Sequence, residues 1–307
     1  MNIGFMCGMK NNGRYTIDDY LEEIRFAQSI GLDQAWMGQV FSADAISVLT
    51  LAARETTSIR LGTAVTPIQP RHPTSLALQA LTANAASAGR FDLGIGLSHK
   101  LVIEDMYGLS YKKPAQQMRE YLQVLAPLCR RERCDYDGDL YRVHAKLPVA
   151  DAGEVPIIVA ALGPAMLKLA GQLAAGTTTW MTGPKTLAQH TIPLIRHAAA
   201  AADKPQPRVV ASFPIVLTDK PEDAKTQVAD KTAIYGHIPS YKAMLDQEGA
   251  EHPVDLALIG DKATLRSQLQ ALKDLGVDDF NAFCMDTDPE AVQRTLTFLA
   301  EEKTNLR

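Results

Sequence analysis

Hydrophobic and polar positions follow two alternating periods along this chain. Short runs rich in apolar and β-branched residues, such as 3–7 and 91–96, are separated by longer segments in which apolar residues recur every three or four positions, such as 17–30. The short runs are typical of buried strands and the longer segments of amphipathic helices. Their alternation predicts βα units built around a parallel sheet.

We expect eight strands, each followed by a helix. The expected strands are 3–7, 34–37, 60–65, 91–96, 155–161, 177–181, 208–217 and 278–285. Eight βα units favour a closed barrel over a doubly wound sheet, so the predicted fold class is α/β, a (β/α)8 or TIM barrel. The whole chain, 1–307, is predicted to form one domain of this kind.

Two segments interrupt the rhythm. Residues 97–150 contain a helix-like stretch at 114–129 and then Asp137-Gly138 between aromatic residues, which is a hairpin signal. We interpret 97–150 as an elaborated βα loop after strand four, not as a second domain. Residues 221–250 predict a helical insertion after strand seven, before a further helix at 263–275.

Composition and charge exclude several classes of partner. The 307 residues are 46% hydrophobic and 21% charged, with a formal net charge of −4 and no long run of Lys or Arg. Nucleic acid is therefore not expected as a partner, because neutralising phosphates needs clustered cations. No apolar stretch approaches the roughly 20 residues of a membrane span. The spacing of the four cysteines matches neither a disulfide framework nor a zinc site, so we expect a reduced, cytoplasmic protein.

Candidate chemistry is expected where the strands end, because the active site of a TIM barrel lies at the carboxyl ends of its strands. The residues at this end are mostly small or apolar and few are charged: 7–8, 39–40, 64–65, 96–99, 161–163, 181–182 and 285. Such a lining suits a flat, uncharged ring better than a metal-dependent hydrolytic site. No metal is expected, since Asp286 and Asp288 have no further ligand cluster and an exposed helix face explains His190 and His197.

Two glycine-containing motifs are candidate phosphate sites. The turn Leu162-Gly163-Pro164 leads into a helix whose free N–H groups can hold a phosphate, although an ordinary turn would have the same sequence. Gly94-Ile95-Gly96 lacks the third glycine of a dinucleotide-binding motif, because His99 takes its place. We therefore interpret the second motif as something other than a dinucleotide site.

Several segments resemble the luciferase-like monooxygenase superfamily, and within it the branch that uses the deazaflavin coenzyme F420. The segments that carry the resemblance are 31–36, 57–65, 71–73, 88–96, 118–121, 137–138, 160–164 and 259–261. The resemblance covers nearly the whole chain. It implies a TIM barrel, a deazaflavin or flavin cofactor and a homodimer.

The resemblance also implies where the cofactor binds. Family members hold its phosphate near the segment 161–164 and place a bulge, often a cis non-prolyl peptide, against its central ring at the place of Thr63-Ala64-Val65; a plain strand is the alternative. The expected cofactor-binding residues are Gly8, Gln39, Thr63, Ala64, Val65, Gly96, Ser98, Ala161, Leu162, Gly163 and Pro164. Trp36 is expected in the core, whereas Phe41 is the better candidate for stacking. Arg71 is expected either to meet an anionic part of the cofactor or to cap a helix.

The sequence departs from one branch of the family. The sugar-phosphate dehydrogenases have an Asp-His pair after strand two and a Glu after the glycine of strand four. Here those places hold Gln39-Val40 and Leu97. Oxidation of an alcohol needs a base for the hydroxyl proton, which valine cannot supply. We therefore predict against sugar-phosphate oxidation.

The expected activity is hydride transfer from reduced F420 to a small molecule with an electron-poor C=C, C=N or C=O bond. Gln39, Ser98 and His99 are placed to orient the substrate, and of the three only His99 titrates near neutral pH. His99 and Gln39 are the predicted catalytic residues. An FMN-dependent monooxygenase is the first alternative, and a non-catalytic flavin-binding barrel is the second.

Overall fold

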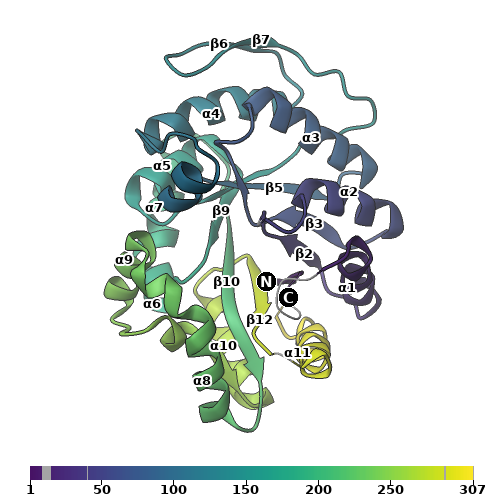
Figure 1. Cartoon of the computed structure of the whole chain (residues 1–307), viewed down its shortest axis with the longest axis vertical. Coiled ribbons are helices and arrows are strands. Elements are labelled where there is room, and N and C mark those ends of the chain that lie inside the picture. Colours follow the sequence, from purple (N-terminus) through teal and green to yellow (C-terminus); the bar gives the residue numbers. More distant parts are fainter. Residues whose placement is uncertain (9–14, 40, 287, 307) are drawn as a thin grey trace.

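The chain folds into a closed barrel of parallel strands (Figure 1). The structure is a computed structural model that describes residues 1–8, 15–39, 41–286 and 288–306. Eight strands follow one another around the barrel: β1 (Asn2–Met6), β2 (Gln34–Met37), β3 (Arg60–Thr63), β5 (Phe91–Gly96), β8 (Ile157–Ala160), β9 (Gly176–Thr179), β10 (Arg208–Leu217) and β12 (Asp279–Cys284). The sheet closes because β12 pairs with β1, for example Phe280 with Ile3. The predicted TIM barrel is confirmed.

Helices surround the barrel on its outer side. They are α1 (Ile17–Ser29), α2 (Ala45–Glu55), α3 (Pro73–Ala86), α4 (Pro114–Cys129), α5 (Pro164–Leu173), α7 (Ile192–Ala200), α10 (Lys262–Asp274) and α11 (Pro289–Glu302). Their ends follow local sequence signals: Thr16 forms a capping box with Asp19 at the start of α1, and Pro73 begins α3. Within the described part of the chain, no helix is long and apolar enough to cross a bilayer.

Residues alternate along each strand between the outer core and the barrel interior. On β1, Ile3 and Phe5 belong to the main hydrophobic core, which also contains residues of the surrounding helices such as Ile24. Met6 belongs instead to a separate cluster inside the barrel, together with Trp36. This period of two is the expected consequence of strand geometry, and it leaves few positions to fill the interior.

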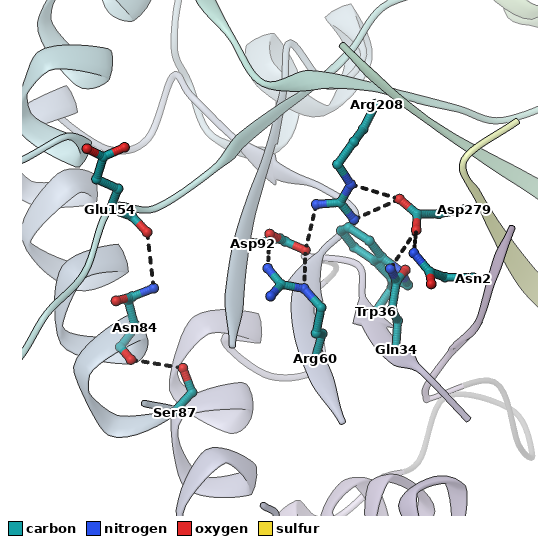
Figure 2. Close-up of polar contacts among 10 residues, drawn as sticks. All are labelled: Asn2, Gln34, Trp36, Arg60, Asn84, Ser87, Asp92, Glu154, Arg208 and Asp279. Carbon is teal, nitrogen blue, oxygen red and sulfur yellow. Dashed lines mark hydrogen bonds and ion pairs between the residues drawn. The ribbon is translucent and has the colours of Figure 1, made fainter. Parts of the chain in front are cut away.

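A buried ionic network fills the interior at the amino-terminal ends of the strands (Figure 2). The Arg208 guanidinium lies between Asp92, at 3.2 Å, and Asp279, at 2.7 Å, and Arg60 pairs with Asp92 at 2.6 Å. Gln34 adds an amide hydrogen bond of 2.7 Å to Asp279. Burial alone would lower the pKa of Arg208, but the two carboxylates outweigh it and raise this pKa, so the guanidinium stays charged. Each buried carboxylate thus has a cation, as a buried charge requires.

Trp36 lies in the barrel interior next to this ionic network. Its side chain is 1% exposed, and its Nε1 donates a hydrogen bond of 2.8 Å to Gln34 Oε1. Gly62 leaves the space that the indole occupies, since a Cβ atom there would lie 2.4 Å from the ring. The expectation that Trp36 packs in the core is confirmed.

The two predicted elaborations are present. The loop after β5 contains a short π-helix, η2 (Val102–Met106), then α4 and the antiparallel hairpin β6 (Cys134–Asp137) and β7 (Arg142–Ala145), which projects at the top of Figure 1. The hairpin turn is longer than a two-residue Asp-Gly turn, because Asp137 pairs with Arg142 and 138–141 form the loop. The insertion after β10 consists of α8 (Pro221–Thr232), η4 (Ala233–His237) and α9 (Pro239–Glu248).

Other parts differ from the sequence-based expectation. Strand 60–65 is not continuous: β3 ends at Thr63, and a two-residue strand, β4 (Thr66–Pro67), pairs separately with β5. A further parallel segment, β11 (Leu258–Gly260), follows η5 (Pro253–Leu256) and pairs with the end of β10. The chain between β9 and α7 also includes α6 (Pro184–Thr186) and the π-helix η3 (Leu187–Thr191). Pairing between strands that lie far apart in the sequence decides the first two features, which a local pattern does not contain.

Candidate active site

Several side chains inside the barrel at the carboxyl ends of the strands are small or apolar. Five of them are half-buried: Met6, Ala64, Ala160, Trp180 and Phe283. They lie above the indole of Trp36, at the end opposite the ionic network, and we call this region the mouth of the barrel. Uncharged, partly exposed groups of this kind suit a flat ring system.

The bulge between β3 and β4 faces two glycines of β5. Thr63 Oγ1 donates a hydrogen bond of 2.7 Å to the Gly94 carbonyl and accepts one of 2.9 Å from the Gly94 N–H. A Cβ atom on Gly96 would lie 2.7 Å from Val65 Cγ2. The peptide bond between Ala64 and Val65 is cis, as the family resemblance implies. Gly94-Ile95-Gly96 therefore allows the bulge to approach β5, which explains the motif without a dinucleotide.

The amino terminus of α5 can accept an anion. Gly163 is the N-cap residue, and no described side chain caps it. Around a Cβ atom built on Gly163, the described residues leave open space within 4 Å. Pro164 stands at the first helical position and contributes no donor, but the next backbone N–H groups have no partner within the helix. The Leu162 carbonyl accepts a hydrogen bond of 2.8 Å from His190 Nε2, which fixes this turn.

At the next helix along the chain, α6, a side chain of the protein itself binds the amino terminus. Glu248, at the end of α9, accepts hydrogen bonds from the backbone N–H groups of Lys185, at 3.0 Å, and Thr186, at 2.7 Å, in α6. A carboxylate therefore occupies the position that an external anion would take there. Of these two adjacent helix ends, only that of α5 is open to a phosphate.

Two of the predicted site residues form hydrogen bonds with the neighbouring helices α1 and α2. Gly8 has a φ of +83°, its N–H donates a hydrogen bond of 2.8 Å to Glu23, and a Cβ atom would lie 2.4 Å from the Tyr20 ring. Gln39 accepts a hydrogen bond of 2.9 Å from the Ala45 N–H at the start of α2. The cofactor and catalytic roles of Gly8 and Gln39 stay predictions. Val40, at the place of the histidine in the sugar-phosphate dehydrogenases, lies outside the described residues.

His99 and Ser98 follow the end of β5. Ser98 has a φ of +55°, and its carbonyl accepts a hydrogen bond of 3.3 Å from Tyr111. The imidazole of His99 contacts the ring of Tyr241 edge-on, at 5.6 Å between centroids. Burial lowers the pKa of His99, so the ring is neutral at pH 7. His99 is thus a neutral, half-buried group beside the mouth.

Other candidates have identifiable partners. Arg71 forms an ion pair with Asp44, which caps α2, so this arginine joins two loops. Phe41 is 59% exposed and packs on Tyr107 at 5.3 Å, and its stacking on a cofactor stays a prediction. All four cysteines are free and buried. Asp288 caps α11, and the described residues contain no group of three or more side chains that could hold a metal ion.

Four aromatic residues at this end of the barrel were not predicted from the sequence. They are Trp180 and Phe283, which lie at the ends of β9 and β12, and Tyr235 and Tyr241, which belong to the insertion after β10. Trp180 could have been found, because it lies near the carboxyl end of the predicted strand 177–181. The two tyrosines could not, because the sequence does not indicate how the insertion packs.

Comparison with known proteins adds relatives of this chain. The sequence profile of the luciferase-like monooxygenase family matches residues 1–297. The chain is 31% identical over 163 residues to a 5,10-methylenetetrahydromethanopterin reductase of Archaeoglobus fulgidus, a match that covers 53% of this chain and 49% of the relative. It is 29% identical over 237 residues to the protein of the same name from Methanolobus tindarius, covering 77% of this chain and 72% of the relative. The match thus spans about half the length of the first relative and more of the second.

Solved structures share the whole barrel. An F420-dependent secondary alcohol dehydrogenase in complex with an F420–acetone adduct has a TM-score of 0.83 at 19% identity and covers 100% of this chain and 99% of that chain. The oxygenating constituent of a 3,6-diketocamphane monooxygenase from Pseudomonas putida, in complex with FMN, has a TM-score of 0.79 at 19% identity and covers 99% and 98%. At these identities the likeness concerns the fold alone.

Proposed function

Because the chain belongs to the luciferase-like monooxygenase family and is therefore an enzyme, we propose that it uses coenzyme F420 to reduce a small organic molecule. The substrate would carry an electron-poor C=C, C=N or C=O bond. One observation carries the proposal: the open amino terminus of α5 lies at the same end of the barrel as the uncharged mouth. A phosphate-bearing cofactor with a flat ring matches both features at once.

In this proposal, different residues at this end of the barrel bind the phosphate and the ring of the cofactor. The backbone N–H groups that follow Gly163 and Pro164 hold the phosphate, with Ala161 and Leu162 forming the turn beneath it. The bulge at Thr63, Ala64 and Val65 supports one face of the ring, and Gly96 leaves room beside it. When bound, the reduced deazaflavin supplies a hydride from its ring. The apolar side chains of the mouth exclude water from the acceptor.

Proton supply and substrate orientation belong to the loop after β5. His99 is neutral at pH 7 and can donate an N–H hydrogen bond to a carbonyl or imine of the substrate. Ser98 and Gln39 add hydrogen-bonding groups at the same rim. Leu97, half-buried beside them, offers no carboxylate. Oxidation of a sugar phosphate therefore remains disfavoured in this proposal.

An FMN-dependent monooxygenase is the second candidate, because a neighbour with the same fold is in complex with FMN. A non-catalytic flavin-binding barrel is disfavoured, because relatives of that type lack parts of the barrel and this chain has all eight βα units. A homodimer and a cytoplasmic location, both expected from the sequence and its resemblance, stay predictions. Sedimentation of the purified protein tests the homodimer.

Titration of the purified protein with reduced F420 and with reduced FMN tests the proposed function. We expect F420 to bind more tightly, with reduction of an activated alkene or ketone and without oxygen uptake. Far tighter binding of FMN, together with oxygen consumption, contradicts the proposal and supports the monooxygenase. Absence of turnover with either cofactor over a broad panel of acceptors contradicts both.

A further inference from the structure

Five aromatic side chains form a continuous series of ring contacts at the mouth. We call them the aromatic arc: His99, Tyr241, Tyr235, Trp180 and Phe283. The centroid distances between successive rings are 5.6, 5.3, 5.6 and 4.6 Å. The first three contacts are edge-on, which is a favourable geometry for aromatic pairs, and the last is tilted. Four segments distant in the sequence therefore meet through rings.

The insertion after β10 is held firmly enough to present its two tyrosines. Besides the two backbone bonds described above, Glu248 accepts a hydrogen bond of 2.7 Å from Thr186 Oγ1. A Cβ atom on Gly183 would lie 2.3 Å from the Glu248 carboxyl carbon, so glycine lets the carboxylate approach this closely. Leu245 of α9 also packs in one apolar cluster with Met181. Polar and apolar contacts together fix α9 against the unit after β9.

We propose that the aromatic arc is the substrate-facing wall of the site, that it selects planar, uncharged acceptors, and that Tyr241 is a positioning residue for His99. This inference rests on the proposed function, and it names the substrate class of that same site. We infer the wall character from exposure: all five residues are half-buried, so each keeps part of its surface accessible to a ligand. A planar conjugated acceptor can cover that surface by offset or edge-on contact.

Charge supports the same substrate class. With His99 neutral, no member of the arc carries a charge, and burial raises the pKa of Tyr241 so that its phenol stays protonated. A carboxylate or phosphate group against this wall would lose hydration without gaining a cation from it. A neutral conjugated ketone has no such penalty.

Tryptophan fluorescence reports binding to the wall without turnover. The chain has two tryptophans, of which Trp36 is 1% exposed on the floor of the barrel and Trp180 belongs to the arc. We would titrate the wild-type protein with three probes. They are benzalacetone, a planar neutral enone, cinnamate, its charged counterpart, and 4-cyclohexylbut-3-en-2-one, which has a non-planar ring.

We expect benzalacetone to quench the tryptophan emission with a Kd at least about tenfold below the Kd values of the other two probes. The variant Trp180→Phe should lose the quenching. Equal affinities for the three probes overturn the inference.

Alanine variants test the two tyrosines. Tyr235→Ala and Tyr241→Ala each remove ring contacts, so we expect the Kd of benzalacetone to rise roughly fivefold. Tyr241→Phe keeps the ring and should bind like the wild type. Tyr136→Ala, on the hairpin outside the mouth, is the matched control and should leave the Kd unchanged. If Tyr235→Ala and Tyr241→Ala fold and bind benzalacetone like the wild type, the wall is not where we place it; if they do not fold, the wild-type probe series decides.

The positioning role has a readout of its own. The titratable groups around His99 are Tyr241, Tyr111 through the Ser98 carbonyl, and the exposed pair Lys100–Glu104 on the same loop. Tyr241→Ala exposes the imidazole, so the pH midpoint of turnover should move up toward the ordinary range of histidine, whereas Tyr241→Phe should not move it. An unmoved midpoint in Tyr241→Ala contradicts the positioning role.

Failure of the inference and failure of the proposed function can be told apart. The preference for F420 or FMN is measured with the cofactors alone, whereas the probe titrations measure the wall whichever cofactor is bound. If FMN proves to be the cofactor while benzalacetone remains the preferred probe, the assignment of F420 is wrong and the role of the aromatic arc is supported. If F420 binds as proposed while the three probes bind equally, the proposed role of the aromatic arc is wrong and the assignment of F420 is supported.

Discussion

The carbonyl oxygen of Thr63 lies 1.7 Å from the position that a Cβ atom would take on residue 94. No side chain other than that of glycine fits at this point of β5 unless β3 moves. The bulge that follows Thr63 therefore depends on a glycine about thirty residues later in the sequence. The contact links the packing of two strands to the shape of the mouth.

Gly94→Ala is predicted to destabilise the protein strongly. The added methyl group meets backbone, which cannot rotate away as a side chain can, so we expect a loss of about 3 kcal/mol or more in the free energy of unfolding. Urea unfolding followed by far-UV circular dichroism measures it. Gly153→Ala is the control, because its Cβ atom would lie at an ordinary 3.5 Å from Asn84 Oδ1. Equal stabilities of the two variants would contradict the geometry described here.

The bulge also shows where the sequence ceased to be informative. Residues 60–65 are a single β-rich run by local pattern, and the eight-strand count was correct. The interruption after Thr63 is decided by how closely β5 approaches, which involves residues of another strand. The motif Gly94-Ile95-Gly96 carried the signal, but a glycine pattern does not say whether a ligand or a neighbouring strand needs the space.

The interior ionic network was not predicted either, because it also depends on residues of different strands. Arg208, Asp92 and Asp279 each stand near the beginning of a strand, where a charged residue is unremarkable. Arg208 is 116 residues from Asp92 and 71 from Asp279 along the chain. Closure of the barrel brings the three side chains together, and the residue pattern within one strand does not predict this contact. The same holds for Tyr241 and His99 at the other end.

Arg208→Met is predicted to cost about 3–5 kcal/mol of unfolding free energy, because it leaves Asp279 buried without a cation. Adding Asp279→Asn should recover part of this loss, since the uncompensated charge is then removed. Arg133→Met is the control: its pair with Asp135 is exposed to solvent, so its loss should change the free energy of unfolding little. Chemical unfolding of the four proteins measures the differences. A loss in Arg208→Met no larger than that of the control would mean that the network contributes little.

Gly163→Asp is predicted to change stability and cofactor binding in opposite directions. Aspartate is a good N-cap residue, so α5 should be stabilised by a few tenths of a kcal/mol or be unaffected. The same carboxylate would repel the cofactor phosphate, and we expect the Kd for reduced F420 to rise about tenfold. Gly163→Ala adds a methyl group into open space and is the neutral control. Unchanged affinity in Gly163→Asp would place the phosphate elsewhere.

His99→Ala is predicted to slow turnover far more than it weakens cofactor binding. Reduction of the acceptor consumes a proton, and the imidazolium form of His99 is the group at the rim able to donate it near neutral pH. Burial lowers the pKa of His99, so this form is a minority at pH 7 and disappears as the pH rises. In the wild type, kcat/KM should therefore fall with increasing pH through a midpoint below the ordinary value of 6.5 and then level off.

The histidine variant should remove that midpoint and lower kcat by about a hundredfold, the scale of a lost general acid. The Kd for F420, measured by titration without acceptor, should stay within about twofold, because the proposed phosphate site and ring support do not include the imidazole. His237→Ala is the matched control, since His237 is exposed on η4 and has no role in the proposed chemistry. If His99→Ala keeps both the rate and the midpoint, the proton must come from another group or from solvent, and the role of His99 reduces to packing against Tyr241.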